Sequence, residues 1–321
     1  MLLLSQYKIH PKHGPDRNQQ SNQKDHPESC YALGAKRRFT TTGRRAEYHA
    51  IGVAPIDFFR VCEASTALMI ISVANQKGGA AKTTSAVNLA AGLVLEGYKV
   101  LLLDMDPQTN ATQVFLHPDV EVELEQSLYS SLIHYSPITP LIRKTALDNL
   151  DFVPSHIRMS GVDLDLAHVY DNRSARLRRA LNGVSDRYDY VIIDNPPALG
   201  LLTVNSFVAS DKILIPVSTG FFALTGLVQL LETVEMVKQT QLNPKLDIVG
   251  VLCTFSERTN VSSDVERQLR DHFDSLVFDI KIPKNISLEE AHSNHTHIFE
   301  YAPTSAGARA YKALVKEVLA R

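Results

Sequence analysis

The 321-residue chain contains no tryptophan and only three cysteines, Cys30, Cys62 and Cys253. These cysteines have neither the CxxC nor the Cys/His spacing of a zinc site and do not indicate a disulfide framework. No apolar run approaches the roughly 20 residues that cross a bilayer, and the start, MLLLSQYK, is too short and lacks the basic residues of a secretory signal. The sequence therefore predicts a cytoplasmic protein.

The chain also has no large excess of charge of one sign, because it contains 33 Lys and Arg and 35 Asp and Glu. These charges are, however, unevenly distributed along the sequence. Residues 1–68 hold 10 basic and 6 acidic side chains, net +4, whereas residues 69–321 hold 23 and 29, net −6. The first segment is rich in Gln, Asn, His, Pro and Arg without sustained periodicity, which favours disorder. Two interpretations remain open: an extension before a start of translation at Met69, or a basic arm that touches DNA.

From Met69 onward, short apolar segments alternate with helical ones. Seven segments are predicted to be strands: 70–74, 99–106, 150–155, 190–195, 212–217, 247–255 and 276–283. Amphipathic stretches such as 84–98 and 222–240 lie between them. This alternation predicts an α/β fold with a mostly parallel sheet covered by helices on both faces. We expect residues 69–321 to form one domain, with 117–150 as a short helix and loops at its rim.

The stretch SVANQKGGAAKTTSAVNL, residues 72–89, predicts a strand, a glycine-containing loop and a helix that begins near Lys82. In this arrangement the backbone N–H groups of the loop and of the helix start converge on an anion, which the helix dipole also favours. Lys82 can then reach the β- and γ-phosphates of a nucleotide, and the Thr83 hydroxyl can ligate Mg²⁺. The usual pattern G-x-x-x-x-G-K-(S/T) is not met, because Gln76 and Ala81 occupy its glycine positions.

The loop instead matches the pattern K-G-G-x-x-K-(S/T), through Lys77, Gly78, Gly79, Lys82 and Thr83. This pattern resembles the deviant Walker A motif of the ParA/MinD group of P-loop ATPases, and NQKGGAAKTT is most similar to the ParA (Soj-like) partition ATPases. The resemblance continues, in family order and spacing, through VLLLDMDPQTNAT, RLRRAL, YDYVIIDNPPALGLLTVNSF, FFALTGL, IPKNISLEEAHS and YAPTSAGARAYKALVKEV. It covers essentially all of residues 69–321 and none of the segment before them.

The resemblance implies that ATP and Mg²⁺ bind at the loop and that two subunits enclose two nucleotides in a homodimer. The residues expected to contact the nucleotide are Lys77, Gly78, Gly79, Ala80, Ala81, Lys82, Thr83, Thr84 and, beside the adenine, Pro283. Lys82 would serve the nucleotide of its own subunit, whereas Lys77 would cross the interface. A second ammonium offsets charge that develops during phosphoryl transfer, as an arginine finger does. The Cβ of Ala81 could hinder the approach of the backbone to phosphate.

Three aspartates follow two of the predicted strands. Asp104, Asp106 and Asp194 emerge where strands end, at the edge where open α/β sheets bind ligands. Strand alternation places Asp104 and Asp106 on the same side. By resemblance, Asp106 orients the attacking water and Asp194 has the Walker B role, holding Mg²⁺ through a water and accepting from Thr83. Asp104 is predicted to be structural.

DNA binding must be local, because a folded part of net charge −6 does not attract DNA through its bulk charge. Arg258 and Lys284 match positions that carry non-specific DNA contacts in Soj-like proteins, and further candidates are Arg267, Arg270, Arg309, Lys312 and Lys316. The last three share one face of the final predicted helix. Where relatives often carry another arginine, this chain has Ser287, which with Glu290 forms the S-x-x-E pattern of a helix cap.

The resemblance therefore implies a partition ATPase that binds DNA in its ATP-bound dimer and is released when a ParB-type protein stimulates hydrolysis, with a cytoplasmic, nucleoid-associated location. A MinD-like membrane-cycling ATPase would need an amphipathic anchor after the last helix, and the sequence ends at KEVLAR. An iron–sulfur carrier would need cluster-binding cysteines, and a tyrosine-kinase relative would need a terminal tyrosine cluster. A regulator that binds ATP and hardly hydrolyses it remains an alternative.

Overall fold

The structure, a computed structural model, describes residues 67–116, 119–170, 172–220 and 225–321. The two interpretations of residues 1–68 concern a segment that lies outside these ranges, except for its last two residues. The strands of the described part are β1 (Met69–Val73), β2 (Val100–Asp104), β3 (Arg143–Lys144), β4 (Leu150–Val153), β5 (Tyr190–Asp194), β6 (Lys212–Ser218), β7 (Asp247–Ser256) and β8 (Val277–Pro283). All seven predicted strands are therefore confirmed.

These eight strands form one sheet in the order β3-β4-β2-β5-β1-β6-β7-β8. Every pairing between neighbours is parallel except that of β3 with β4, which is antiparallel. The short strand β3 was not predicted, because it consists of two basic residues and has no apolar pattern. Strand β1 lies between β5 and β6, so the chain leaves it toward one edge of the sheet and later returns to build the other. Ligand sites of open α/β sheets lie at such a point, outside the carboxyl ends of the strands.

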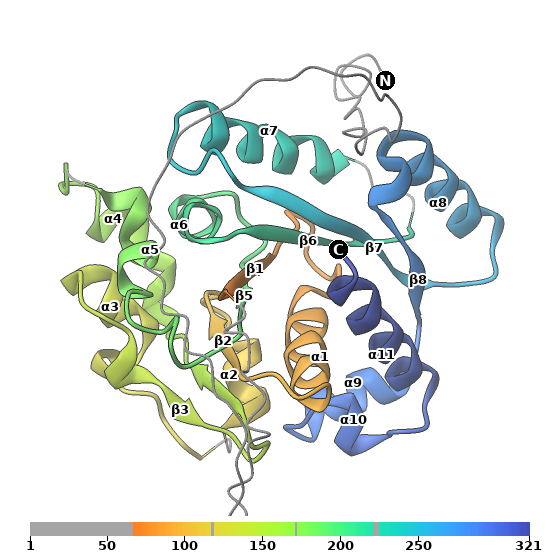
Figure 1. The fold of residues 1–321 in the computed structure, drawn as a ribbon, viewed down its shortest axis with the longest axis horizontal. Coiled ribbons are helices and arrows are strands. Elements are labelled where there is room, and N and C mark those ends of the chain that lie inside the picture. The colour runs from red at the N-terminus through yellow and green to blue at the C-terminus, as the bar shows by residue number, and fades with distance from the viewer. Residues whose placement is uncertain (1–66, 117–118, 171, 221–224) are drawn as a thin grey trace, which may run out of the picture. The chain divides into compact units, whose positions relative to one another are not determined.

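Helices cover both faces of the sheet, as predicted (Figure 1). The helices in the described ranges are α1 (Lys82–Leu95), α2 (Asn110–Phe115), α3 (Leu128–His134), α4 (Val162–Asp165), α5 (Arg176–Ala180), α6 (Leu201–Ala209), α7 (Thr225–Gln239), α8 (Asn260–Phe273), α9 (Ile286–Ser293), α10 (Ile298–Tyr301) and α11 (Ala306–Leu319). Successive residues of β2 face opposite layers. Val100 and Leu102 belong to the core that contains α1 and α11, and Leu101 and Leu103 to the core that contains α3, α5 and α6.

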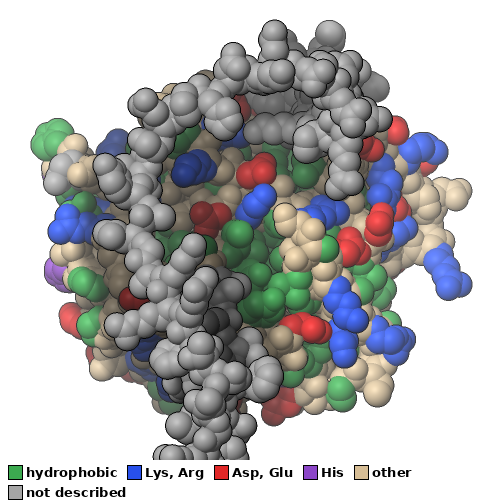
Figure 2. Space-filling model, viewed as in Figure 1, with side chains coloured by type: hydrophobic (Ala, Val, Ile, Leu, Met, Phe, Trp, Pro, Cys, Tyr) green, Lys and Arg blue, Asp and Glu red, His purple; other side chains and the backbone are tan. Residues whose placement is uncertain are grey.

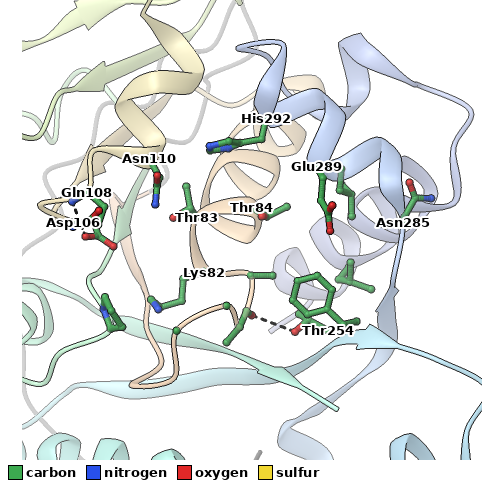
Figure 3. Close-up of a pocket in the computed structure, with 18 of the residues that line it drawn as sticks. Lys82, Thr83, Thr84, Asp106, Gln108, Asn110, Thr254, Asn285, Glu289 and His292 are labelled. Carbon is green, nitrogen blue, oxygen red and sulfur yellow. Dashed lines mark hydrogen bonds between the residues drawn. The ribbon is translucent and has the colours of Figure 1, made fainter. Parts of the chain in front are cut away.

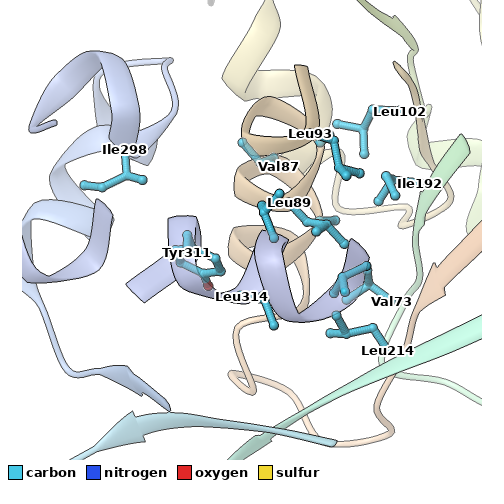
Figure 4. Packing of buried hydrophobic residues seen from close by; sticks show 14 of the residues in the cluster. Val73, Val87, Leu89, Leu93, Leu102, Ile192, Leu214, Ile298, Tyr311 and Leu314 are labelled. Carbon is cyan, nitrogen blue, oxygen red and sulfur yellow. The ribbon is translucent and has the colours of Figure 1, made fainter. Parts of the chain in front are cut away.

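Helix α1 is packed between the sheet and α11, which fixes the orientation of its N-terminus. Figure 4 shows Leu89 and Leu93 of α1 beside Leu314 of α11 and close to Val73 and Leu102 of the sheet. All five side chains are almost completely buried. Full burial of each such side chain stabilises the fold by roughly 1.5–3 kcal/mol. The strand before the loop and the helix after it are therefore held rigidly, and the loop between them has little freedom.

Candidate nucleotide-binding site

The loop between β1 and α1 is anchored by the side chain of Asn75. Its Nδ2 donates to the carbonyl of Pro216 (2.6 Å), and its Oδ1 accepts the backbone N–H of Lys77 (2.9 Å). Gly79 has φ 66°, in the left-handed region that glycine adopts without steric cost. Helix α1 begins at Lys82, as the sequence predicts, and its first three residues line the hollow beside the loop. These N–H groups and the helix dipole make the loop suited to an anion.

Ala81 is the residue at which the loop turns into α1, and it has φ 63° and ψ 34°. A left-handed conformation costs a residue with a Cβ about 1–2 kcal/mol relative to glycine. The second glycine of the usual phosphate-loop pattern belongs at this position. The departure seen in the sequence therefore places an alanine where the backbone favours glycine.

Ala81→Gly is expected to stabilise the nucleotide-free protein by about 0.5–1 kcal/mol, because relief of the left-handed strain exceeds the extra chain entropy of glycine. Equilibrium denaturation in urea measures this difference. Ala80→Gly is the matched control, since buried Ala80 has no positive φ and its replacement should destabilise the protein. An Ala81→Gly variant no more stable than the parent would show that the loop carries no strain at this residue.

Lys82 lies buried at the start of α1. Its Nζ donates to the backbone carbonyl of Lys77 (3.2 Å), which holds the ammonium against the loop. Burial lowers the pKa of Lys82, while the negative charges of Asp194 and Asp106 raise it. A buried ammonium held against the loop is well placed to meet the charge of a phosphate group.

Asp194 ends β5 and is completely buried. No hydrogen bond of ordinary geometry reaches either carboxylate oxygen from the described residues, and the Thr83 side chain, close enough to lower the pKa of Asp194, is only a weak donor to it. Burial raises the pKa of Asp194 well above its ordinary value, and the charge of Asp104 adds to this, whereas Thr83 and Lys82 oppose it. A buried carboxylate without a partner is costly, and a cation would relieve that cost. The oxygen donors of Asp194 and Thr83 suit Mg²⁺, which takes oxygen ligands and keeps several waters.

Asp104 and Asp106 differ in their surroundings, although they are two residues apart. The Asp104 carboxylate accepts three hydrogen bonds, from the N–H and hydroxyl of Thr112 (2.8 and 2.7 Å) and from the N–H of Asp106 (3.0 Å). Burial raises the pKa of Asp104 to about 6, against the lowering effect of these bonds. Asp106 lines the cavity beside the loop and accepts the N–H of Gln108 (2.9 Å). These contacts fit the structural role predicted for Asp104 and leave Asp106 facing the cavity.

The phosphate loop opens into a cavity of about 510 Å³ between α1, α2 and α9. Residues 78–84 form one wall, with Asp106, Gln108 and Asn110 at one end (Figure 3). Phe255, Ile282, Leu288 and Tyr311 add an apolar lining, and the neighbours of Phe255 and Leu288 in the chain, Thr254 and Glu289, lie at the end away from Asp106. The opposite wall is α9, from which Glu289 and His292 extend. The cavity can accommodate a molecule with an anionic part and an apolar part.

The cavity gathers Gly78, Gly79, Ala80, Ala81, Lys82, Thr83, Thr84 and Asp106 of the predicted site. Lys77 and Pro283 are not among the described residues that line it. Pro283 instead lines a neighbouring hollow of about 500 Å³, so its predicted contact with adenine remains untested. Glu289 and His292 of α9 were missed, because from the stretch IPKNISLEEAHS only Pro283 was assigned to the nucleotide.

That neighbouring hollow contains Arg258, Lys281 and Arg309 from three separate elements. Figure 2 shows Lys and Arg side chains, mixed with Asp and Glu, on the side of the molecule that carries α8, β8 and α11. Lys284 pairs with Glu257 at 3.2 Å. Of the predicted basic residues, Arg258 and Arg309 therefore line one hollow, and acidic side chains accompany the basic ones on this side.

Two of the predicted DNA-contacting arginines are engaged within the protein. Arg267 pairs with Asp264 (2.7 Å) and Arg270 with Glu266 (3.4 Å) and Asp279 (3.4 Å). Lys312 and Lys316, by contrast, are exposed on α11. The α8 arginines are accordingly less available to a ligand than the α11 lysines.

The predicted cap of α9 at Ser287 is wrong. The helix begins at Ile286, and its cap is Asn285, whose Oδ1 accepts the N–H of Ser287 (2.9 Å). Asparagine is as favourable as serine at a helix N-cap and here comes two residues earlier in the chain. Ser287 is therefore inside the first turn.

None of the helices in the described ranges combines the length and the apolar character needed to cross a bilayer. Within the same ranges, no group of three or more His, Cys, Asp or Glu side chains is arranged to hold a metal ion by itself. A cation at Asp194 would accordingly need further ligands from water or from a bound anion, as Mg²⁺ commonly has.

Comparison with known proteins supports the same kind of site. A family model described as an AAA domain matches residues 68–248. The chain is 44% identical to the sporulation initiation inhibitor protein Soj of Bacillus subtilis over 252 residues, 78% of this chain and 98% of that protein. It is 40% identical to the chromosome partitioning protein ParA of Caulobacter vibrioides over 258 residues, 79% of this chain and 95% of that protein.

Among solved structures, the fold is similar to cobyrinic acid a,c-diamide synthase from Mycobacterium smegmatis with a bound ATP analogue and magnesium. The TM-score is 0.67 at 30% identity, over 78% of this chain and 94% of that one.

Proposed function

Because the chain belongs to the ParA/Soj family of partition ATPases, we propose that it moves DNA by a cycle in which MgATP joins two subunits, the dimer holds DNA, and hydrolysis releases it. The chain is an ATP hydrolase that uses ATP and Mg²⁺. The observation that best supports the cycle is the buried carboxylate of Asp194 beside the phosphate loop, which no hydrogen bond of ordinary geometry satisfies within the described residues. A Mg²⁺ ion bound together with the triphosphate would offset the negative charge of this carboxylate.

Each residue of the site takes a role that its surroundings support. The N–H groups of residues 78–84 and the Lys82 ammonium would hold the phosphates. Thr83 would hold Mg²⁺ directly and Asp194 would hold it through a water, and the ion would neutralise charge on the phosphate oxygens. Asp106, which faces the cavity, orients the attacking water. Its negative charge lies close enough to raise the pKa of Lys82, so both groups act at the same end of the cavity.

Lys77 acts on the nucleotide of the partner subunit. Its backbone carbonyl is engaged by Lys82 of the same chain, and its partly exposed side chain is not among the described residues that line its own cavity. A lysine that extends outward from the loop can reach a second subunit docked over the cavity. Hydrolysis then requires the dimer, because each site is completed by the other subunit.

The dimer binds DNA without sequence preference through Arg258, Lys284 and the exposed face of α11. Two copies of this surface double the basic patches that face one duplex, so binding depends on ATP. Nothing in the described part presents a recognition helix with base-reading side chains, so the contacts go to phosphates. A ParB-type partner stimulates hydrolysis and thereby release, and DNA binding gives the protein a cytoplasmic, nucleoid-associated location.

The ion pair between Lys284 and Glu257 provides a test of DNA binding, because substitutions of its two members should change DNA affinity in opposite directions. Lys284→Glu and Arg258→Glu should each weaken ATP-dependent binding to two unrelated duplexes about tenfold or more, because phosphate contacts are replaced by repulsion. Glu257→Gln should instead strengthen binding, since it frees Lys284 from its 3.2 Å partner. The measurement is a salt titration of DNA affinity with and without ATP, in which affinity should fall steeply with salt.

A chain that begins at Met69 is the control for the basic first segment and should bind nearly as well as the whole protein. If that shortened chain loses DNA binding while the two charge-reversed variants keep it, residues 1–68 carry the DNA. Binding that is equally tight without nucleotide would contradict the cycle itself.

A further inference from the structure

The two ends of the nucleotide cavity differ in chemistry, which orients the nucleotide within it. The loop, Lys82 and Asp106 occupy one end, where the triphosphate and its metal belong. Phe255, Ile282 and Leu288 line the other end and suit the flat apolar faces of a purine. The base is therefore expected on the α9 side, away from Lys82.

Glu289 is an acidic residue in the wall of a cavity that receives a highly negative ligand. Figure 3 shows its carboxylate pointing from α9 into the cavity, on the side away from Lys82 and Asp106. His292, one turn further along α9, points instead across the cavity toward Asn110. Glu289 is exposed to solvent in the nucleotide-free protein. Because a carboxylate beside the triphosphate would be repelled, its place in the cavity wall fits contact with the nucleoside rather than with the phosphates.

We propose that Glu289 selects adenine by accepting a hydrogen bond from the 6-amino group of the base. An ionised carboxylate can only accept hydrogen bonds. Adenine presents an amino donor at this position, whereas guanine and hypoxanthine present the O6 acceptor. Two facing acceptors repel, so Glu289 both binds ATP and disfavours GTP and ITP. This role rests on the nucleotide use proposed above and adds the choice of base.

The experiment compares ATP with ITP, because the two bases differ at the 6-position and the neighbouring N1 proton. Displacement of a fluorescent ATP analogue by each nucleotide, with Mg²⁺, gives the two dissociation constants for the parent and for Glu289→Gln. The parent should prefer ATP by about tenfold. The glutamine variant should lose most of that preference, chiefly by binding ITP more tightly, since its amide N–H can donate to O6.

Glu290→Gln is the matched control, because Glu290 is the next residue of α9, is exposed like Glu289, and accepts a hydrogen bond from the hydroxyl of Tyr301 (3.3 Å) instead of lining the cavity. It should keep the parental ATP preference. Lys82→Ala should weaken the binding of ATP and ITP by the same factor, which tests phosphate binding separately from base selection. An ATP-to-ITP ratio in Glu289→Gln within twofold of the parental ratio would overturn the inference. A loss of preference for ATP over 2′-deoxy-ATP alone would also overturn it and assign Glu289 to the ribose.

Discussion

Lys77→Ala should lower stimulated ATP turnover by about 10³-fold, the lower end of the effect of an arginine finger supplied by another subunit. ATP binding should persist in part, because residues 78–84, Lys82 and Asp194 remain in place around the cavity. Phosphate release in the presence of DNA and a ParB-type partner measures the turnover. Displacement of a fluorescent ATP analogue measures the binding.

Mixing two defective proteins separates action on the partner's nucleotide from action within one subunit. Lys77→Ala should be mixed with Asp106→Ala, which keeps Lys77 and whose own site is inactive. In a mixed dimer, the intact lysine of the second protein completes the site of the first. About a quarter of the parental turnover should return, since about half of the dimers are mixed and each has one competent site. No recovery would indicate that Lys77 acts within its own subunit.

Asp106→Asn should slow hydrolysis by about 10²–10³-fold and leave ATP binding intact, because a positioned carboxylate contributes about this much to activation of a water. In the parent, Asp106 accepts the N–H of Gln108 at 2.9 Å, and an asparagine can still accept this hydrogen bond, so the local loop should keep its shape. Single-turnover hydrolysis measures the rate. Asp104→Asn is an unsuitable substitute, since it would disturb the three bonds that Asp104 accepts.

Asp106→Ala should accumulate the ATP-bound state for the same reason. If Asp106→Asn hydrolyses ATP at the parental rate, Asp106 does not take part in the reaction. Loss of ATP binding in Asp106→Ala would instead make the residue part of the phosphate site.

The fold was largely predictable because its strands are short, apolar and regularly separated by helices. Strand β3 was missed because its two residues, Arg143 and Lys144, pair with β4 only through tertiary structure. The cap of α9 was misplaced by two residues, because the S-x-x-E pattern does not distinguish Ser287 from the equally favourable Asn285. The choice between two favourable N-cap residues depends on the backbone geometry of the segment that precedes the helix, which a single sequence does not contain.

The loop half of the site was predictable, whereas the α9 half was not. Residues 77–84 form one continuous motif, and its resemblance to the deviant Walker A pattern indicates their chemistry. Glu289 and His292 reach the same cavity only because β8 runs beside β7 and delivers α9 to the loop. The sequence shows Ala81 as a departure from a glycine pattern, but its left-handed φ could be known only from the structure.

The measurement that tests the central claim most directly is the molar mass of the Asp106→Ala protein in solution, by light scattering, with MgATP, with MgADP and without nucleotide. A site that MgATP completes across two subunits predicts twice the monomer mass with MgATP alone. A monomeric mass at saturating MgATP, or the same mass under all three conditions, would contradict the account.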